Sequence, residues 1–388
     1  MQFLFVINSL GKGGAEKQVL LLAYAMANLG WNGEVITFEK RATNLEIEDL
    51  ISRCEASGVI ISQPRSRFFR RSVLYLRLLH RFYFSKVELV WLWGAKIEAV
   101  AKVLLFRKKG TTIFSSLRSA GRDVVAKRKS IYRFRQQLID AYVSNSHLNI
   151  DIFKAIVPMQ AKQIDLKPRF LVLNNCLGIE TCPDPVEPEL KSCEIESKKQ
   201  DGVKDVTQGL RVGVLGNNRF YLKGYDLLIE IAKKIKLSGR AIKISLAGKD
   251  YENDLASKIE HHDVAEIIDY IGEVDDSRRF LHEQDLFLLT SRVEGMPNSL
   301  IEAMSLGIPS ISTKVGDLEI LFGAAEALRL CEIEDIESMF ETICWCQDHW
   351  DKALAMGARG KDAVRSQMGM ISIQKRLEEI LEEFGFHS

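Results

Sequence analysis

The sequence predicts an α/β protein made of two Rossmann-like, doubly wound domains. With 388 residues the chain is too long for one compact core and fits two domains of ordinary size. Its hydrophobic fraction of 46% and charged fraction of 27% are typical of globular proteins. Short apolar runs alternate with helical patterns, and a strand followed by a glycine-rich loop and a helix occurs in each half. This alternation favours two parallel sheets covered by helices.

The first half opens with an expected strand at residues 2–9, a glycine-rich turn at 10–16 and a helix from about 17 to 29. Gly13 and Gly14 let the backbone approach a bound group where a Cβ would clash, and the helix N-terminus favours negative charge. The turn lacks the G-x-G-x-x-G pattern, so a plain tight turn is the alternative to a phosphate-binding loop. The further strands expected in this half are residues 34–38, 87–91, 111–116, 141–144 and 169–173.

The composition changes between the two halves, where three prolines precede a polar, charged stretch. This pattern is typical of a linker, and we place it at residues 183–207, between a first domain at 1–182 and a second at 208–370. The second domain is expected to begin with a strand, a glycine-rich loop and a helix. The strands expected in it are residues 210–215, 242–247, 267–271, 285–290 and 310–313.

The richest stretch of the second half is residues 291–309, S-R-V-E-G-M-P-N-S-L-I-E-A-M-S-L-G-I-P. Residues 299–302 form a capping-box sequence, which predicts that the loop from Glu294 to Asn298 ends on free N–H groups at a helix N-terminus. An anion or a polar hydroxyl can bind there. On these residues alone, the alternative is that Glu302 only caps the helix and Glu294 is a solvated acid.

The string E-G-M-P-N-S-L-I-E-A-M resembles the E-G-x-P-N-x-x-x-E-A-M signature of the retaining glycosyltransferases of family 4, or group 1, which have the GT-B fold. The shorter segments 141–146 and 173–180 resemble strand ends of the same family. The resemblance implies an acceptor-binding first domain and a nucleotide-sugar-binding second domain facing a central cleft. It also implies that a C-terminal helix, residues 371–388, crosses back to the first domain, and we expect acceptor-specific variation within 41–140.

The resemblance assigns roles to individual residues. It implies that Glu294 contacts the transferred sugar and Glu302 the ribose of the nucleotide. The donor-binding residues that it implies are Gly13, Gly14, Asn217, Gly295, Met296, Asn298, Ser299, Leu300 and Glu302. The expected acceptor-binding residues are Glu16, Arg118 and Asn145.

Two cations in the second glycine-rich loop, Arg219 and Lys223, are suited to neutralising a diphosphate leaving group. A solvated pair is the alternative. The sequence also departs from the family, which has an arginine directly after the first glycine of this loop, where the chain has Asn217. Either Arg219 takes over that role, or Lys223 and helix dipoles hold the diphosphate.

The family often has a histidine near the end of the strand expected at 111–116, and this chain has Arg118 in that region. An arginine cannot act as a base near neutral pH, so Arg118 is expected to bind a phosphate or an anionic acceptor. The expected catalytic residues are Glu294, as the resemblance implies, and the two cations Lys223 and Arg219. No side chain is an obvious nucleophile, so the donor phosphate itself is expected to deprotonate the acceptor. A glycosidase pair of Glu294 and Glu302 is the less favoured interpretation.

Several enzyme classes lack their signatures here. No Asp-x-Asp follows an expected strand, and neither G-x-x-x-x-G-K-[ST] nor G-x-S-x-G occurs, which argues against metal-dependent GT-A transferases, P-loop NTPases and α/β-hydrolases. The seven cysteines have no disulfide or zinc spacing, so we expect free thiols, no structural metal and no cofactor beyond the nucleotide sugar.

The expected function is metal-independent, retaining transfer of a hexose or N-acetylhexosamine from a nucleotide-diphosphate sugar to a hydroxyl. The favoured donor is a UDP-sugar, and the favoured acceptor is a lipid-linked or cell-surface glycan of lipopolysaccharide or capsule biosynthesis. The alternatives are a catalytically silent sugar-nucleotide-binding scaffold and a GT-B epimerase or phosphorylase.

The charge of the chain is divided unevenly. Residues 1–175 hold 28 Lys+Arg and 13 Asp+Glu, or +15, and residues 176–388 hold 25 and 39, or −14. Residues 66–84 form a predicted amphipathic helix with aromatic side chains opposite a basic face of Arg67, Arg70, Arg71, Arg77 and Arg81. The aromatic face either packs into the first domain or lies at an anionic membrane. We favour the membrane, because the first half carries a +15 surplus and arginines combined with aromatics suit anionic lipid headgroups. Nucleic acid is the other anionic candidate, but the sugar-transfer motifs give it no role. We therefore expect a cytoplasmic protein attached peripherally to the inner face of the membrane.

Overall fold

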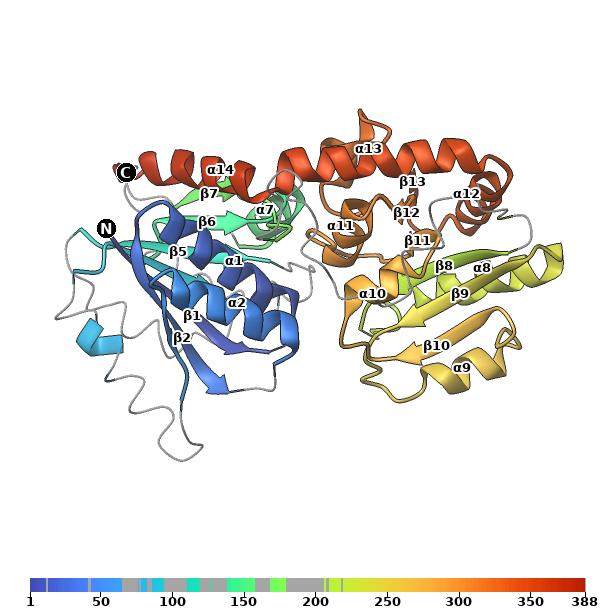
Figure 1. The fold of residues 1–388 in the computed structure, drawn as a ribbon, viewed down its shortest axis with the longest axis horizontal. Helices are drawn as coiled ribbons and strands as arrows, with labels where there is room; N and C mark the ends of the chain where they lie inside the picture. The colour runs from blue at the N-terminus through green and yellow to red at the C-terminus, as the bar shows by residue number, and fades with distance from the viewer. Residues whose placement is uncertain are drawn as a thin grey trace, which may run out of the picture. The chain divides into compact units, whose positions relative to one another are not determined.

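The computed structural model describes residues 1–11, 13–40, 43–64, 76, 78–81, 86–93, 110–118, 126, 138–157, 168–178, 206, 209–217 and 219–387 (Figure 1). The chain forms two compact units. The first unit comprises Met1–Cys176, Glu294–Asn298 and Gln367–Ser388, and the second comprises Leu177–Val293 and Ser299–Ser366. The linker expected at 183–207 lies outside the described residues, except for Val206.

The first unit contains a parallel sheet of seven strands in the order β3-β2-β1-β4-β5-β6-β7. The strands are β1 (Gln2–Leu10), β2 (Asn32–Lys40), β3 (Ile60–Ser62), β4 (Leu89–Trp93), β5 (Thr112–Leu117), β6 (Ala141–Ser144) and β7 (Arg169–Val172). All five residues of β4 are buried, as expected for a strand covered on both faces. The strand order reverses between β1 and β4, which pair in parallel, and such a switch point is where doubly wound sheets bind ligands.

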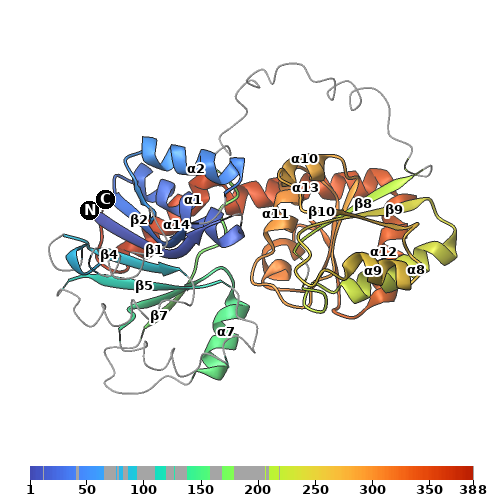
Figure 2. The same ribbon diagram turned by 90° about the horizontal axis from the view of Figure 1, so that it is seen from below.

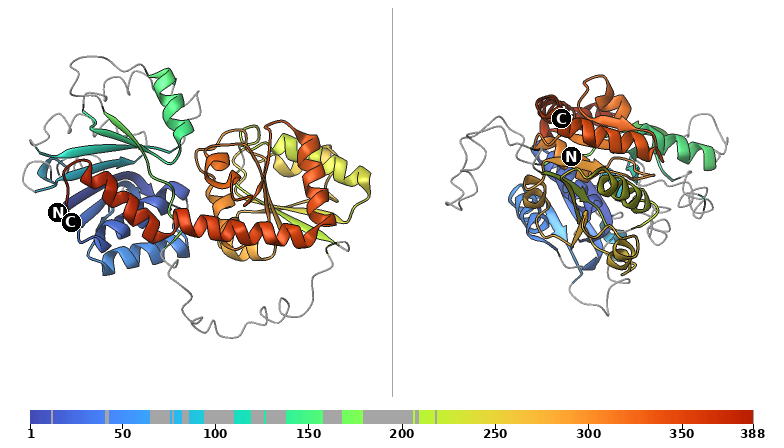
Figure 3. Two further views of the ribbon diagram at one scale, coloured as in Figure 1. Left: turned by 90° about the horizontal axis from the view of Figure 1, so that it is seen from above. Right: turned by 90° about the vertical axis from the view of Figure 1, so that its right-hand side faces the viewer.

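The described helices of the first unit include α1 (Gly14–Asn28), α2 (Leu45–Ala56), α7 (His147–Ile156) and α14 (Met370–Glu382). Helix α1 packs against α2, β1, β2 and α14, and Figure 2 shows α1 and α2 side by side. Helix α1 begins three residues before the predicted start, because Gly13 in an extended conformation is its N-cap. Figure 3 marks the two ends of the chain close together. Near the C-terminus, the Phe386 ring lies 5.3 Å from the ring of Trp31, which directly precedes β2.

The second unit contains a parallel sheet of six strands in the order β10-β9-β8-β11-β12-β13. The strands are β8 (Leu210–Leu215), β9 (Ile242–Ala247), β10 (Ile268–Gly272), β11 (Leu286–Leu289), β12 (Ser310–Thr313) and β13 (Arg329–Cys331). The described helices are α8 (Tyr225–Ser238), α9 (Leu255–His261), α10 (Ser277–His282), α11 (Asn298–Ser305), α12 (Ile336–Asp348) and α13 (Trp350–Met368), with a π-helix, η3, at Glu319–Gly323. Asn298 at the start of α11 and residues 367–368 at the end of α13 belong to the first unit. Its switch point lies between β8 and β11.

The start of α11 corrects the capping-box interpretation. The helix begins at Asn298, so Ser299 lies inside its first turn and Glu302 lies beyond that turn. Pro297 explains the difference, because proline disfavours a helical conformation of the residue before it and tolerates a helix after it. Ser299 and Glu302 therefore do not form the predicted cap.

The basic helix expected at residues 66–84 is largely outside the described residues, including Arg67, Arg70, Arg71 and Arg77. Arg81 is described, and its Nη2 lies 2.8 Å from Oε2 of Glu34, whose side chain is only 4% exposed. The assignment of Arg81 to an open basic face was therefore wrong, because a buried acid of β2 engages it.

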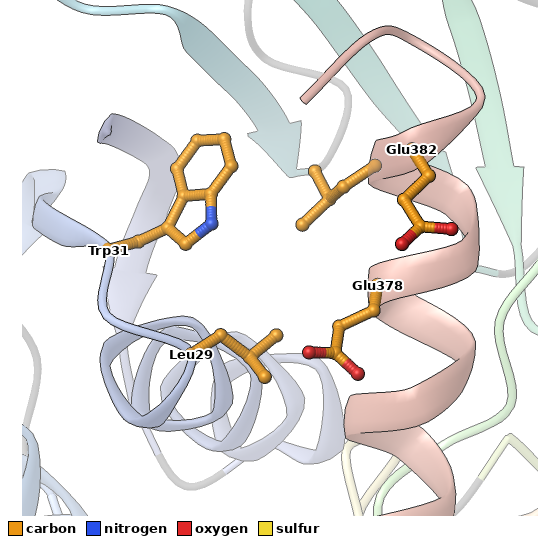
Figure 4. Close-up of a pocket in the computed structure, with 5 residues that line it drawn as sticks. Leu29, Trp31, Glu378 and Glu382 are labelled. Atoms are coloured by element: carbon orange, nitrogen blue, oxygen red, sulfur yellow. The ribbon is translucent and has the colours of Figure 1, made fainter. Parts of the chain in front are cut away.

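A small surface pocket of the first unit lies where α14 meets the end of α1 (Figure 4). It is lined by Leu29, Trp31, Glu378, Leu381 and Glu382. Glu378 and Glu382 are one turn apart on α14. We interpret the pocket as a gap left where α14 packs on the rest of the first unit, and not as a ligand site. No helix in the described part of the chain combines the length and the apolar composition needed to cross a membrane.

Candidate active site

Polar side chains of the first unit gather at the carboxyl edge of its sheet. Trp93 ends β4, Arg118 follows β5, Asn145 follows β6 and Asn175 lies three residues after β7. Because parallel strands end at the same edge, residues far apart in sequence meet there. The structure joins three of the predicted residues, Arg118, Asn145 and Asn298, through Asn175, which the sequence analysis did not single out.

Asn175 is the centre of this network. Its Nδ2 donates to Oδ1 of Asn298 at 2.6 Å and to the backbone oxygen of Met296 at 3.5 Å. Its Oδ1 accepts from Nη1 of Arg118 at 2.5 Å and from Nδ2 of Asn145 at 3.3 Å. One buried amide therefore ties the signature loop to the ends of β5 and β6.

The backbone at two of the predicted glycines closely approaches asparagine side chains, which leaves no room for a Cβ. A Cβ on Gly295 would lie 2.4 Å from Nδ2 of Asn149 and 2.8 Å from Oδ1 of Asn145. These two amides are themselves hydrogen-bonded at 3.1 Å. A Cβ on Gly14 would lie 2.1 Å from Nδ2 of Asn298. We call Asn145, Asn149, Asn175 and Asn298 the asparagine cluster, and the two glycines allow the loop and α1 to contact it.

Arg118 lies beside this cluster with an unusual set of contacts. Its Cζ lies 4.4 Å from the centroid of the Trp93 ring, a cation–π arrangement. The residue as a whole is half-buried, but its Nε and Nη2 atoms are buried and have no hydrogen-bond partner among the described residues. Burial lowers the pKa of Arg118 to about 9.

In the second unit, the glycine-rich loop after β8 holds Lys223 next to Gly224, the N-cap of α8. Its Nζ lies 3.6 Å from the place where a Cβ on Gly216 would be, while Oη of Tyr225 donates to the Gly216 oxygen at 2.6 Å. The backbone oxygen of Lys223 accepts from Oγ1 of Thr290 at 2.8 Å. Gly224 has a left-handed conformation, with φ of +65°. The lysine is therefore positioned at a helix N-terminus, next to the switch point of the sheet.

Arg292, which the sequence analysis passed over within the signature stretch, braces the same loop. Its Nη1 and Nη2 each donate to Asp226 at 2.7 Å, and its Nε donates to Glu334 at 2.6 Å. Nη1 also donates to the Tyr221 oxygen at 2.6 Å, and Cζ lies 4.0 Å from the Tyr221 ring centroid. The Arg292 N–H donates to the Leu222 oxygen at 2.9 Å. We call this set of contacts the Arg292 clamp.

The ion pair between Arg292 and Asp226 favours the charged form of both side chains. Hydrogen bonds to Asp226 raise the pKa of Arg292 against the opposing effect of burial, and Glu334 adds to the increase. Burial raises the pKa of Asp226, but the hydrogen bonds and charge of Arg292 outweigh it and lower the net value. The clamp is therefore a fully ionised pair at neutral pH.

The other predicted residues of the second unit have separate contacts. Arg219 is exposed, and its backbone oxygen accepts from the Lys223 N–H at 2.9 Å. Oδ1 of Asn217 accepts from the Lys249 N–H at 3.1 Å, and Oε2 of Glu302 accepts from Oγ of Ser277 at 3.1 Å.

Within α11, Ser299 is half-buried, whereas the side chain of Leu300 is fully buried, which leaves only its backbone to meet a ligand. In the first unit, Glu294 is half-buried, and Glu16 folds back so that its carboxylate lies over Gly13.

The second unit contains a stretch that matches a known protein family. Residues 209–349 match the family model described as glycosyl transferases group 1. The predicted resemblance to group 1 glycosyltransferases is confirmed over these residues.

Curated relatives match the chain over short segments. The chain is 28% identical over 111 residues to N-acetyl-alpha-D-glucosaminyl L-malate synthase of Bacillus anthracis, which covers 29% of each protein. It is 41% identical over 71 residues to the Vi polysaccharide biosynthesis protein VipC/TviE of Salmonella typhi, or 18% of this chain and 11% of that protein. A third match, 41% over 66 residues, is the teichuronic acid biosynthesis glycosyltransferase TuaC of Bacillus subtilis, or 17% of each. The matched segments span less than a third of these relatives.

Solved structures resemble the chain over nearly its full length. Anabaena HepE in complex with UDP and glucose matches with a TM-score of 0.72 at 15% identity, covering 99% of this chain and 100% of that one. A glycosyltransferase of Rickettsia africae matches with a TM-score of 0.70 at 14% identity, covering 100% and 99%. With the two parallel sheets, these likenesses confirm the predicted GT-B fold.

Proposed function

We propose that the chain is a glycosyltransferase that moves a hexose or N-acetylhexosamine from a UDP-sugar to a hydroxyl group. The observation that carries this proposal is the position of Lys223, which the loop after β8 and the Arg292 clamp hold at the N-terminus of α8. The family of residues 209–349 supports it, as does HepE, which binds UDP-glucose. A fixed cation beside a helix N-terminus is suited to a departing diphosphate.

In the proposed reaction, the bond from the anomeric carbon of the sugar to the diphosphate oxygen breaks. The acceptor oxygen forms a bond to the same carbon on the same face, and its proton passes to the released phosphate, so configuration is retained. Lys223, Arg219 and the α8 dipole supply the positive charge, and the proposed reaction therefore needs no metal. Glu294 contacts the transferred sugar, and Glu302, held by Ser277, contacts the ribose.

The proposed acceptor is a lipid-linked or cell-surface glycan of a polysaccharide pathway, including lipopolysaccharide or capsule. Relatives named for Vi polysaccharide and teichuronic acid biosynthesis support this choice. The first unit supplies the acceptor site through Glu16, Arg118 and Asn145.

Peripheral attachment to the inner face of the membrane is proposed from the +15 surplus of residues 1–175 and from Arg67, Arg70, Arg71 and Arg77. It is tested by sedimentation with liposomes at low salt. Anionic liposomes are expected to bind more protein than neutral ones, and Arg70→Gln with Arg77→Gln is expected to reduce the difference. Equal sedimentation in all cases would exclude attachment.

The function is tested by transfer from a panel of radiolabelled UDP-sugars to glycan acceptors. Lys223→Ala is expected to lower turnover about 10²- to 10³-fold, the usual loss for one preorganised charge contact. Lys233→Ala is the control, because Lys233 lies on α8 itself and pairs only with exposed Glu230 among the described residues. An unchanged rate for Lys223→Ala at saturating donor would remove this role.

The same assay distinguishes the proposed roles of Glu294 and Glu302. Glu294→Ala is expected to abolish most transfer, and Glu302→Ala to raise mainly the donor KM. The opposite pattern would exchange their roles.

A catalytically silent scaffold is the second candidate, favoured by Arg118 in the region of the family's histidine and by Asn217 in the position of its arginine. A scaffold would bind UDP-sugars without turnover. An epimerase would change the donor without an acceptor, and a phosphorylase would require free phosphate.

A further inference from the structure

Arg118 presents an unused pair of hydrogen-bond donors. Its Nη1 donates to Asn175 at 2.5 Å, whereas Nε and Nη2 have no partner among the residues that the structure describes. These two atoms form the side-on edge of the guanidinium, in which two parallel N–H groups point the same way. That edge matches the two oxygens of a carboxylate.

Because the Nε and Nη2 edge of Arg118 is buried, the lack of a described acceptor for it costs free energy. Nε and Nη2 are both buried, and an uncompensated buried charge is costly unless a counter-charge satisfies it. Trp93 adds a third donor, because its Nε1–H is also buried without a partner among the described residues, and Arg118 lies against its ring. Three donors in one small region of the first unit therefore have no acceptor among the residues that the structure describes.

The surroundings fix the guanidinium in place. Asn175 accepts from its Nη1 and is held in turn by Asn298 and Asn145, while the Trp93 ring covers the guanidinium from one side. A preorganised arginine loses little freedom when a ligand binds, which is how a small anionic group gains affinity.

We propose that Arg118 and Trp93, braced by the asparagine cluster, form a carboxylate-binding site, and that the acceptor is an organic acid or an acidic sugar. The carboxylate lies on the Nε and Nη2 edge, and the acceptor hydroxyl belongs to the same molecule. The acceptor role rests on the proposed function, whereas the carboxylate site stands on the contacts of Arg118 alone.

A carboxylate fits better than a phosphate for a reason of charge. Arg118 contributes one positive charge, and the Asn amides around it contribute none. A carboxylate carries one negative charge and balances it, whereas a phosphate dianion would bury one unmatched charge. The single planar fork also matches two coplanar oxygens.

The experiment measures binding of D-glucuronate to the full chain by ligand-observed NMR titration, with D-glucuronamide as its neutral counterpart. Glucuronate is expected to bind at least about tenfold more tightly than glucuronamide, because hydrogen bonds to a charged group are lost in the amide. This comparison needs no variant, so it does not depend on how a variant folds. Equal affinity of the two probes would overturn the proposal.

Variants identify the residue responsible. Arg118→Lys keeps the charge but removes the fork, and it is expected to weaken glucuronate binding about ten- to a hundredfold. Trp93→Phe keeps the ring and removes the Nε1–H, and a smaller loss of about threefold is expected. The matched control is Arg329→Lys, because Cζ of Arg329 also lies 4.4 Å from a tryptophan ring, that of Trp345. Equal losses for Arg118→Lys and Arg329→Lys would place the binding elsewhere.

Two further titrations distinguish a failure of the carboxylate proposal from a failure of the proposed function. Inorganic phosphate is expected to compete at least about tenfold less well than glucuronate, and equal competition would overturn the choice of a carboxylate. UDP binding is measured for each protein and is expected to be unchanged by Arg118→Lys. Failure of the wild-type chain to bind UDP would contradict the proposed function while leaving the glucuronate result intact.

Discussion

Arg118 in the first unit and Arg292 in the second are two versions of one arrangement. Each follows the carboxyl end of a parallel strand, β5 or β11, and each stacks on an aromatic ring, at 4.4 Å from Trp93 and 4.0 Å from Tyr221. They differ in their hydrogen bonds. All three nitrogens of Arg292 bond to groups of its own unit, whereas Nε and Nη2 of Arg118 find no described partner. We infer that Arg292 stabilises a loop and that Arg118 binds a ligand.

The pKa directions of the two arginines follow the same division. Hydrogen bonds to Asp226 raise the pKa of Arg292, and burial lowers that of Arg118 to about 9. A bound carboxylate would raise the pKa of Arg118 again, because it stabilises the charged form. The comparison therefore predicts that the same substitution has opposite effects on stability at the two positions.

The largest expected effect is that of Arg292→Met. Its side chain is 8% exposed. Its removal takes both guanidinium donors from Asp226 and leaves the Tyr221 oxygen with the Gly224 N–H, at 3.1 Å, as its remaining donor. We expect the free energy of unfolding to fall by about 3 kcal/mol, near the lower end for breaking a buried pair, because both acidic partners reach solvent. Urea unfolding measures the change.

The control for this change is Arg240→Met. Arg240 also forms a bidentate pair, with Asp348 at 2.7 and 2.9 Å, but its side chain is 34% exposed. A loss of less than about 1 kcal/mol is expected there, as for exposed ion pairs. If both variants lose the same amount, the Arg292 clamp is no stronger than a surface pair.

A smaller loss is expected for Gly224→Ala, which tests the loop that the Arg292 clamp braces. Gly224 and Gly239 have nearly the same left-handed φ, +65° and +68°. A Cβ on Gly224 would lie 2.0 Å from the Thr290 oxygen, whereas one on Gly239 would meet nothing within 4 Å. We expect Gly239→Ala to cost about 1 kcal/mol for backbone strain, and Gly224→Ala about 2 kcal/mol, because the backbone must also shift.

Turnover distinguishes the two glycine variants further. The shift at Gly224 moves Lys223, so transfer from a UDP-sugar is expected to fall in Gly224→Ala and to persist in Gly239→Ala. Equal turnover in the folded variants would show that the position of Lys223 tolerates displacement.

Much of the fold was predictable because buried parallel strands are apolar runs. β6, β8, β9 and β12 agree with the sequence at both ends. The two described strands that the sequence analysis missed, β3 (Ile60–Ser62) and β13 (Arg329–Cys331), have three residues each, and each begins with an exposed residue at a sheet edge. A run of three residues carries no usable periodicity.

The site was predictable only where its residues lie together in the sequence. The signature stretch predicts roles for Glu294 and Glu302, but the role of Asn175 depends on a hydrogen bond to Asn298, 123 positions later. Arg292 likewise depends on Asp226 and Glu334, on either side of it in sequence. Helical periodicity assigned Arg81 to an open face because it contains no information about an acid on another element, Glu34. Such contacts follow from topology and not from local pattern.

The smallest expected effect has the opposite sign, and it is that of Arg118→Met. Methionine has a similar length without charge, so it removes the two buried donors that have no described partner while keeping contact with the Trp93 ring. The hydrogen bond to Asn175 and the cation–π contact are lost, which offsets part of the gain. We expect the free energy of unfolding without ligand to rise by about 1 kcal/mol, since apolar replacements of buried charges are often stabilising. Urea unfolding with added glucuronate should reverse the order, because only the wild-type chain gains stability from the bound carboxylate. A loss as large as that of Arg292→Met would show that Arg118, like Arg292, is matched within the protein.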